Sequence, residues 1–103
     1  MEETIKVTWS FSALEMLAEI HEYISEKSEQ AADDYIDGIY NSTKKLEHHP
    51  ESCAPCKNHK LREKRYRCCL YKKHIIVYEY MHNIIEILAV IHSSRNPSDV
   101  NIS

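Results

Sequence analysis

The chain has 103 residues, of which 43% are hydrophobic and 28% charged, and this size predicts one compact domain over residues 1–103. It contains one glycine, Gly38, which excludes the glycine-rich loops that cradle phosphates. No apolar run is long enough to cross a bilayer, and the acidic N-terminal segment lacks the apolar stretch of a signal peptide. We therefore expect a soluble, cytoplasmic protein with no membrane partner.

Charge is distributed unevenly along the chain. Residues 1–51 carry a balance of −8 and residues 52–103 a balance of +5, although the formal net charge is only −3. Eight of the nine basic residues of the second half lie between Lys57 and Lys73. This segregation is typical of a face that meets a polyanion or an acidic partner. It also fits a solvated strand edge that lysine and arginine protect from aggregation.

The first half of the chain is predicted to form a short strand and a helical hairpin. Apolar and polar residues alternate over 5–9, which is the pattern of a strand. Apolar residues then recur at helical spacing over 12–48. Ser12–Glu15 has the spacing of a capping box, and Ser28 can cap a second helix. Pro50 ends the hairpin.

The second half is predicted to be a polar loop over 50–60 followed by three strands, near 64–71, 74–80 and 84–92. Two-lysine and Met-His-Asn segments form the turns, where Asn83 tolerates a positive φ. The order βααβββ predicts an α+β fold. In this fold, two N-terminal helices pack on one face of a mainly antiparallel sheet.

Strand alternation assigns side chains to the two faces of the sheet. On the last strand, the residues predicted to face the helices are Ile85, Ile87, Ala89 and Ile91. The opposite face is predicted to be open and to carry the side chains of Arg65, Arg67, Glu79, Glu86 and His92. A half-apolar face with a few charges suits a ligand or a partner segment.

Six short segments stand in a characteristic order, namely Trp9-Ser10, His21–Ile24, His49–Cys53, Tyr66-Arg67, His74–Tyr78 and Ile87–Pro97. In order and spacing they resemble RelE/ParE-type toxins of the plasmid stabilisation family. Such toxins belong to type II toxin–antitoxin modules, and an antitoxin neutralises each one by wrapping a segment over it. The resemblance implies the same βααβββ fold, a cognate antitoxin as partner, a toxin–antitoxin hetero-oligomer and no cofactor.

Members of this family differ in their targets. RelE-like members bind the ribosomal A site and cut mRNA without a metal, whereas ParE-like members inhibit DNA gyrase and are not nucleases. The chain lacks the catalytic aromatic residue of the nucleases near its C-terminus, because Ser93, Ser94 and Arg95 follow His92. Our leading prediction is a metal-independent endoribonuclease that cuts translated mRNA on the ribosome. Gyrase inhibition is the alternative, and a non-toxic relative that only binds an antitoxin is a third reading.

Metal-free RNA cleavage needs a general base, cations for the phosphate and an acid for the leaving oxygen. The predicted catalytic residues are Arg67, His92 and Arg95. The predicted RNA-binding residues are Lys57, Lys60, Arg62, Lys64 and Arg65. The predicted antitoxin-binding residues are Arg65, Arg67, Glu79 and Glu86. Each of these residues also has a purely structural interpretation. His92 would end a strand through a hydrogen bond, and Arg95 would cap the tail. Arg65 and Arg67 would keep a strand face soluble.

The four cysteines raise the question of a metal site. Cys53 and Cys56 have the spacing of zinc ligands, with Cys68 and Cys69 downstream. Adjacent strand residues point to opposite faces, so Cys68 and Cys69 do not readily join the other two around one ion. We therefore predict no metal. In the cytoplasm we expect free thiols rather than disulfides, with Cys68 as a small core residue.

Overall fold

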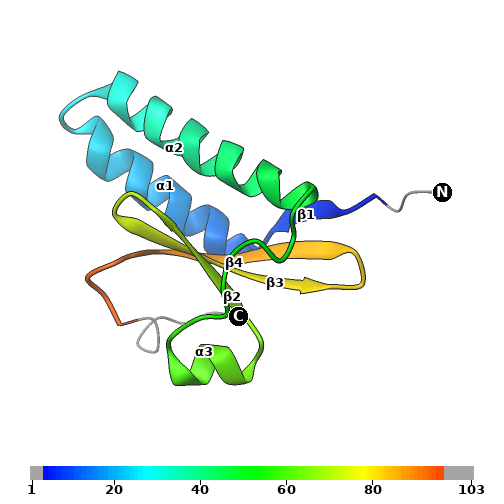
Figure 1. Ribbon diagram of the computed structural model, residues 1–103. Helices are drawn as coiled ribbons and strands as arrows, with labels where there is room; N and C mark the ends of the chain where they lie inside the picture. Colours follow the sequence, from blue (N-terminus) through cyan, green and yellow to red (C-terminus); the bar gives the residue numbers. More distant parts are fainter. Residues whose placement is uncertain (1–3, 97–103) are drawn as a thin grey trace.

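The computed structural model describes residues 4–96 as a four-stranded sheet between two unequal layers of helix (Figure 1). The elements are β1 (Lys6–Trp9), α1 (Phe11–Ser25), α2 (Glu29–Lys44), the 3₁₀ helix η1 (Lys45–Glu47), α3 (His59–Glu63), β2 (Arg67–Tyr71), β3 (His74–Met81) and β4 (Ile84–His92). The predicted α+β order is confirmed, and α3 is an addition to it. No helix in the described range is long and apolar enough to traverse a lipid bilayer.

The sheet has the strand order β1-β4-β3-β2. β1 pairs with β4 in parallel, and the other two pairs are antiparallel, so the sheet is mixed. Between β1 and its parallel partner β4 the chain passes through all the other helices and strands, which is a long connection of the kind that a parallel pair requires. Helices α1 and α2 lie together on one face, which we call the helix side, while α3 lies below the other face (Figure 1).

Serine side chains cap the beginnings of both long helices. The Ser28 hydroxyl accepts the Ala31 N–H at 3.1 Å, as the sequence predicted for α2. For α1, however, the cap is Ser10, whose hydroxyl accepts the Ala13 N–H at 3.0 Å, and the predicted cap at Ser12 is wrong. The Ser10 N–H still donates to the Ile87 carbonyl of β4 at 2.9 Å, so the chain leaves the sheet there and turns directly into the helix.

Two-residue turns join the last three strands. The first is the predicted Lys72-Lys73 turn, whereas the second is His82-Asn83, because Met81 of the predicted three-residue turn still belongs to β3. Tyr71 pairs with His74 across the first turn, and Met81 pairs with Ile84 across the second. His82 and Asn83 both have positive φ, at 52° and 62°. Positive φ at both central positions is the hairpin geometry whose twist matches that of the strands. Lys72 in the first turn also has a positive φ of 48°.

A bulge in β4 changes which residues face the helices. Ile87 lies opposite Tyr78 but Ala89 lies opposite Val77, so Leu88 has no partner on β3. Ile85, Ile87 and Val90 pack into the core beneath α1 and α2, as expected of the helix side. Ala89 and Ile91 instead join a second core on the opposite side, with Val77 and Cys56. The prediction that Ala89 and Ile91 face the helices is therefore wrong, because the extra residue reverses the alternation.

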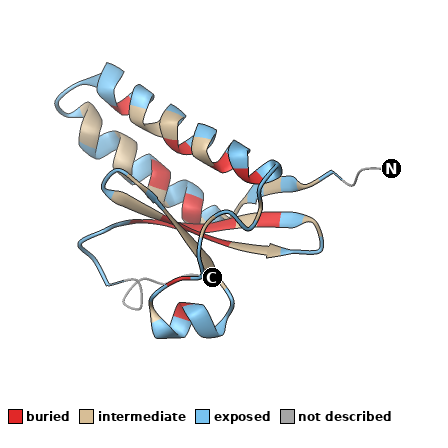
Figure 2. Cartoon of the chain, in the orientation of Figure 1, coloured by how far each residue is buried: buried red, intermediate tan, exposed pale blue. Residues whose placement is uncertain are grey.

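The sheet is thus buried on both faces along its middle strands, as the buried residues in Figure 2 show. On the opposite face, Cys56 and Leu61 from the segment that holds α3 cover Val77 and Ala89. We call this segment, residues 50–66, the basic lobe, and the face that it covers the lobe side. The face that the sequence predicted to be open is therefore partly closed.

Gly38 marks the closest approach of α2 to β2. A Cβ atom at this position would overlap the phenol oxygen of Tyr71. The Tyr71 ring also packs edge-on against Tyr35, with ring centroids 5.2 Å apart. The single glycine of the chain therefore allows α2 to rest directly on an aromatic side chain of the sheet.

Candidate functional site

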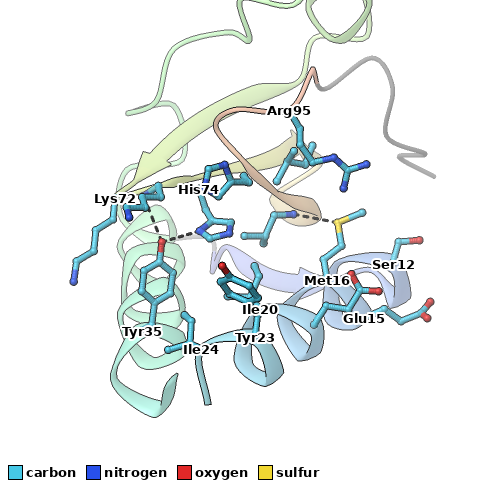
Figure 3. A pocket seen from close by; sticks show the side chains of 15 residues that line it. Ser12, Glu15, Met16, Ile20, Tyr23, Ile24, Tyr35, Lys72, His74 and Arg95 are labelled. Atoms are coloured by element: carbon cyan, nitrogen blue, oxygen red, sulfur yellow. Dashed lines mark hydrogen bonds between the residues drawn. The ribbon is translucent and has the colours of Figure 1, made fainter. Parts of the chain in front are cut away.

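A groove of about 750 Å³ opens on the helix side, at the end of the sheet where β4 finishes (Figure 3). Its walls come from α1, from Tyr35 on α2, from the β2–β3 turn and from the last residues of β4 with Arg95. The turn and the end of β4 are adjacent because His74 pairs with His92. A concave site of this size, between a helix and a strand end, is the form that binding sites usually take.

The floor of the groove is apolar. Met16, Ile20 and Ile24 repeat along one side of α1 and line the groove together with Val90 from β4. The sulfur of Met16 accepts the Val90 N–H at 3.4 Å, which fixes α1 over the end of the bulged strand (Figure 3). Tyr23 also lines the groove and is 75% exposed, so it offers a large apolar surface to a partner.

The two walls of the groove carry opposite charges. Glu15 and Glu19 project from α1 on one wall. Lys72, Lys73 and Arg95 form the other wall, and all three are exposed. The Lys72 ammonium lies over the rings of Tyr35 and Tyr71, at 5.7 and 5.5 Å from their centroids. Such a groove fits a partner segment that combines apolar residues with carboxylates facing the basic wall.

A chain of titratable side chains runs along the basic wall. The Tyr35 hydroxyl accepts the Lys73 N–H at 3.4 Å and lies within hydrogen-bonding distance of Nδ1 of His74, at 2.7 Å. The His74 ring then meets the His92 ring edge-on, with centroids 5.3 Å apart. Burial lowers the pKa of His74, and the nearby His92 lowers it further. Burial also raises the pKa of Tyr35, so its hydroxyl stays protonated.

His92 has a defined hydrogen-bonding arrangement of its own. The Ser94 N–H donates to Nδ1 of His92 at 3.1 Å, and the Ser94 hydroxyl lies 2.8 Å from the same nitrogen. Because an N–H can only donate, Nδ1 is the acceptor, and Nε2 carries the proton of the neutral ring. Arg95 follows directly, with its N–H donating to the His92 carbonyl at 3.0 Å.

The structure brings together only two of the three predicted catalytic residues. His92 and Arg95 both line the groove. Arg67 also lies on the helix side, opposite Tyr78, rather than on an open face. It is separated from the groove along β2, because Tyr71 is the β2 residue opposite His74. Tyr71 lies four positions further along the extended strand than Arg67, which is about 13 Å.

The Arg67 guanidinium is already engaged within the protein. It donates to the carbonyl oxygens of Cys53 at 2.7 Å and Glu51 at 3.3 Å, and it pairs with the Glu51 carboxylate at 3.2 Å. The hydroxyl of buried Tyr78 donates to the Pro50 carbonyl at 2.8 Å beside it. Burial raises the pKa of Tyr78, so this donor stays protonated. Arg67 and Tyr78 together fasten the start of the basic lobe to the sheet.

The predicted antitoxin-binding residues fall on different parts of the molecule. Glu79 and Glu86 are directly paired on the lobe side, half-buried beside Tyr66, whose pKa is raised by burial and by these two carboxylates. Arg65 lies in the turn before β2 with a positive φ of 64°, so it does not share a strand face with Arg67. The prediction that one open face carries all four residues and His92 is wrong. The bulge moves His92 to the helix side, β2 begins only after Arg65, and the pairing of β2 with β3 places Arg67 beside Tyr78 on the helix side.

The predicted RNA-binding residues form one group. All five lie in the basic lobe, on or beside α3, and all are exposed: Lys57, Lys60, Arg62, Lys64 and Arg65. The Asn58 side chain caps α3 by accepting the Leu61 N–H at 3.2 Å. Leu61 is buried on the sheet, so the lobe presents its charged residues outward.

The cysteines form disulfides, and the prediction of free thiols is wrong. Cys53 joins Cys69 and Cys56 joins Cys68, with Cα atoms 5.4 and 4.9 Å apart. Cys69 contacts the core on the helix side and Cys68 the core on the lobe side, so the two bonds lie on opposite faces of β2. The expected divergence of Cys68 and Cys69 is thus observed. Within residues 4–96, no group of three or more His, Cys, Asp or Glu residues could hold a metal ion.

Sequence reasoning missed four residues that line the groove, namely Tyr35, Lys72, Lys73 and His74. The two lysines were assigned only to a turn. A signal for His74 was present, because it alternates with Ile76 and Tyr78, both of which face the helices. The same alternation places His74 beneath α2, where Tyr35 is the nearest hydrogen-bonding partner.

The sheet order, the helical hairpin and the groove beside it define a fold of the RelE/ParE-like toxin class. A family model described as the ParE toxin of the type II toxin–antitoxin system parDE matches residues 7–97. The chain therefore belongs to the ParE toxin family of type II toxin–antitoxin systems.

A solved structure supports the fold. One chain of the chromosomal ParDE TA system from P. aeruginosa superposes with a TM-score of 0.71 at 15% sequence identity. The match covers 86% of this chain and 96% of that chain. No curated protein matches the sequence.

Proposed function

We propose that this protein arrests growth by inhibiting DNA gyrase, without cutting nucleic acid, and that a cognate antitoxin holds it inactive. Gyrase is the target that the resemblance to ParE-like toxins implies. The observation that carries the proposal is the dispersal of the residues that cleavage would need. Arg67 is bonded to Glu51 and Cys53 at one end of β2, while His92 and Arg95 line the groove at the other.

The groove is the proposed seat of the antitoxin segment. Its apolar floor and exposed Tyr23 provide contact area, and its basic wall provides partners for carboxylates. The chain of the ParDE system from P. aeruginosa that shares the fold comes from a toxin–antitoxin pair, which supports an antitoxin partner here. A bound segment would cover His74, His92 and Arg95 together.

One observation favours a second candidate, translation-linked mRNA cleavage on the ribosome. His92 is exposed at the groove, with Arg95, Lys72 and Lys73 around it. A neutral imidazole near several cations is a set that can move a proton and stabilise a phosphate. In this case the groove would hold RNA as well as the antitoxin.

The deciding experiment measures purified gyrase and cellular mRNA with the same two proteins, the wild type and His92→Ala. We expect both to inhibit supercoiling in vitro and to arrest growth, with intact messages, because gyrase inhibition needs no general base. His92 is exposed, so the substitution leaves no cavity in the core.

The opposite pattern would overturn the proposal. If the wild type leaves supercoiling unchanged and creates new 5′ ends in translated messages, cleavage is the function. The His92→Ala protein should then lose about 10²–10⁴ in rate, as expected when a general acid or base is removed. Absence of growth arrest by the wild type would favour a non-toxic relative that only binds an antitoxin.

A further inference from the structure

The basic lobe lies on the side of the sheet away from α1 and α2 (Figure 1). Between Lys57 and Arg65 it carries five exposed cations and a single carboxylate, Glu63. That carboxylate is paired with the His59 imidazole at 2.9 Å. The lobe therefore meets solvent as an almost purely cationic surface.

The lobe is held in one position by several independent contacts. Leu61 and Cys56 are buried against the sheet, and two disulfides join the lobe to β2. A backbone hydrogen bond adds to the attachment, because the Cys68 N–H of β2 donates to the Ala54 carbonyl at 3.1 Å, and within the lobe the Cys56 N–H donates to the Tyr66 carbonyl at 3.0 Å. The cations are thus mounted on a fixed support rather than on a free loop.

We propose that the basic lobe binds the phosphate backbone of double-stranded DNA. Duplex DNA is the densest common polyanion, with one charge for about every 1.7 Å of axis. The surface is suited to phosphates rather than to unpaired bases, because residues 50–66 offer no exposed tyrosine, tryptophan or phenylalanine ring for stacking. Tyr66 is half-buried in the core beneath the lobe, with the Lys64 ammonium 5.9 Å from its ring centroid, and the exposed imidazole of His59 is paired with Glu63.

The placement of the acidic residues also favours the basic lobe as the face that meets DNA. The first 51 residues carry the negative balance, and within the described chain most of their carboxylates lie on α1 and α2, across the sheet from the lobe. A polyanion would repel that side and attract the other, so the protein would approach with α3 leading. This surface is separate from the groove, and the inference goes beyond the proposed action on gyrase.

The test compares two variants that lose the same charge. In the first, Lys57, Lys60 and Lys64 of the lobe are replaced by glutamine. In the second, Lys6, Lys27 and Lys44, which are equally exposed but lie outside the lobe, are replaced by glutamine. Binding to a fluorescent 20-base-pair duplex of mixed sequence is measured by anisotropy at several salt concentrations, and circular dichroism confirms folding.

If five phosphates are contacted, the logarithm of the binding constant should fall with the logarithm of salt with a slope of about −4.5. Removal of three lobe lysines should reduce the slope to about −2 and weaken binding at low salt by about tenfold or more. The variant outside the lobe should keep the slope of the wild type.

Equal losses in the two variants would overturn the proposal, since net charge alone would then govern binding. So would the absence of duplex binding at low salt. Tighter binding of single-stranded RNA or DNA of the same length would assign the lobe to a different ligand. Each of these outcomes can be obtained without gyrase, so the lobe and the proposed function are tested separately.

Discussion

At the scale of single residues, the His74–His92 pair is the most sensitive feature of the groove. Nδ1 of His74 lies 2.7 Å from the Tyr35 hydroxyl, within hydrogen-bonding distance. Burial lowers the pKa of His74 and the neighbouring His92 lowers it further, so both favour the neutral ring. The folded protein therefore resists protonation at a position where the unfolded chain accepts a proton readily.

This arrangement predicts a specific dependence of stability on pH. A depressed folded-state pKa means that the unfolded chain binds the proton first, so stability falls as pH drops below about 6.5. Above about pH 6.5, the stability that neutral His74 contributes to the folded protein is fully present. We expect His74→Gln to flatten the stability profile between about pH 7 and 5, whereas His48→Gln, an exposed loop control, should leave it unchanged. Urea unfolding at several pH values measures the difference.

The effect of His92 on the pKa of His74 can be measured directly by NMR. His92 lowers the pKa of His74 by charge repulsion, so His92→Gln should raise the pKa of His74 toward its ordinary value. An NMR titration of the imidazole carbons follows each histidine separately. A pKa of His74 that stays unchanged in the variant would contradict the coupling.

The sequence was informative about which residues carry chemistry and less so about where they face. His92 and Arg95 were identified and do share the groove. The face of His92 was mispredicted because Leu88 lies within an uninterrupted apolar run, Ile87–Ile91, where no glycine or proline signals a bulge. The face of Arg67 was mispredicted for a different reason, because the two-residue turn between β2 and β3 pairs Arg67 with Tyr78 on the helix side.

At the scale of elements, strongly periodic segments could be predicted and the lobe could not. The hairpin of α1 and α2 and the strands β3 and β4 follow from apolar spacing. Helix α3 has only five residues, which is too short for a helical period to be recognised. The disulfides were missed because the expected compartment argued against oxidation, although the divergence of Cys68 and Cys69 already offered two separate partners.

The disulfides yield a prediction about the lobe and β2. The paired cysteines are 16 and 12 residues apart, and closing a loop of about 15 residues stabilises a protein by about 3 kcal/mol. The two loops overlap, so the second bond should add less than the first. We expect reductant to lower the urea midpoint of the wild type, and single-pair alanine variants to be intermediate.

A variant with all four cysteines replaced by alanine is the control, and its midpoint should not respond to reductant. Thiol counting under denaturing conditions verifies the oxidised starting state. A wild-type protein that titrates with four free thiols after oxidising refolding would refute the pairing.

At the scale of the whole molecule, the sheet separates two surfaces of different character. The groove on the helix side combines apolar residues with both charges, which suits a folded or extended protein segment. The lobe on the other side is cationic and has little exposed apolar surface. A protein partner in the groove and a polyanion on the lobe would therefore not compete for the same residues.

This division predicts where charge reversal disrupts the antitoxin complex. Lys73→Glu with Arg95→Glu should weaken binding of the cognate antitoxin by about tenfold or more, because charge-assisted hydrogen bonds are replaced by repulsion. Arg65→Glu, on the lobe, should change the affinity by less than about twofold, since a distant exposed charge contributes little. Calorimetric titration of each variant with the antitoxin gives both values, and a larger loss for Arg65→Glu would relocate the antitoxin to the lobe.

The bulge at Leu88 also has a genetic consequence. Because Tyr78 pairs with Ile87 and Val77 pairs with Ala89, loss of the Leu88 codon would close the bulge and leave Ala89–His92 opposite the same residues of β3. His92 would stay in the groove, and Ile91 would stay in the core on the lobe side. An in-frame deletion at Leu88 would therefore shorten the strand by one residue without exchanging the two surfaces of the toxin.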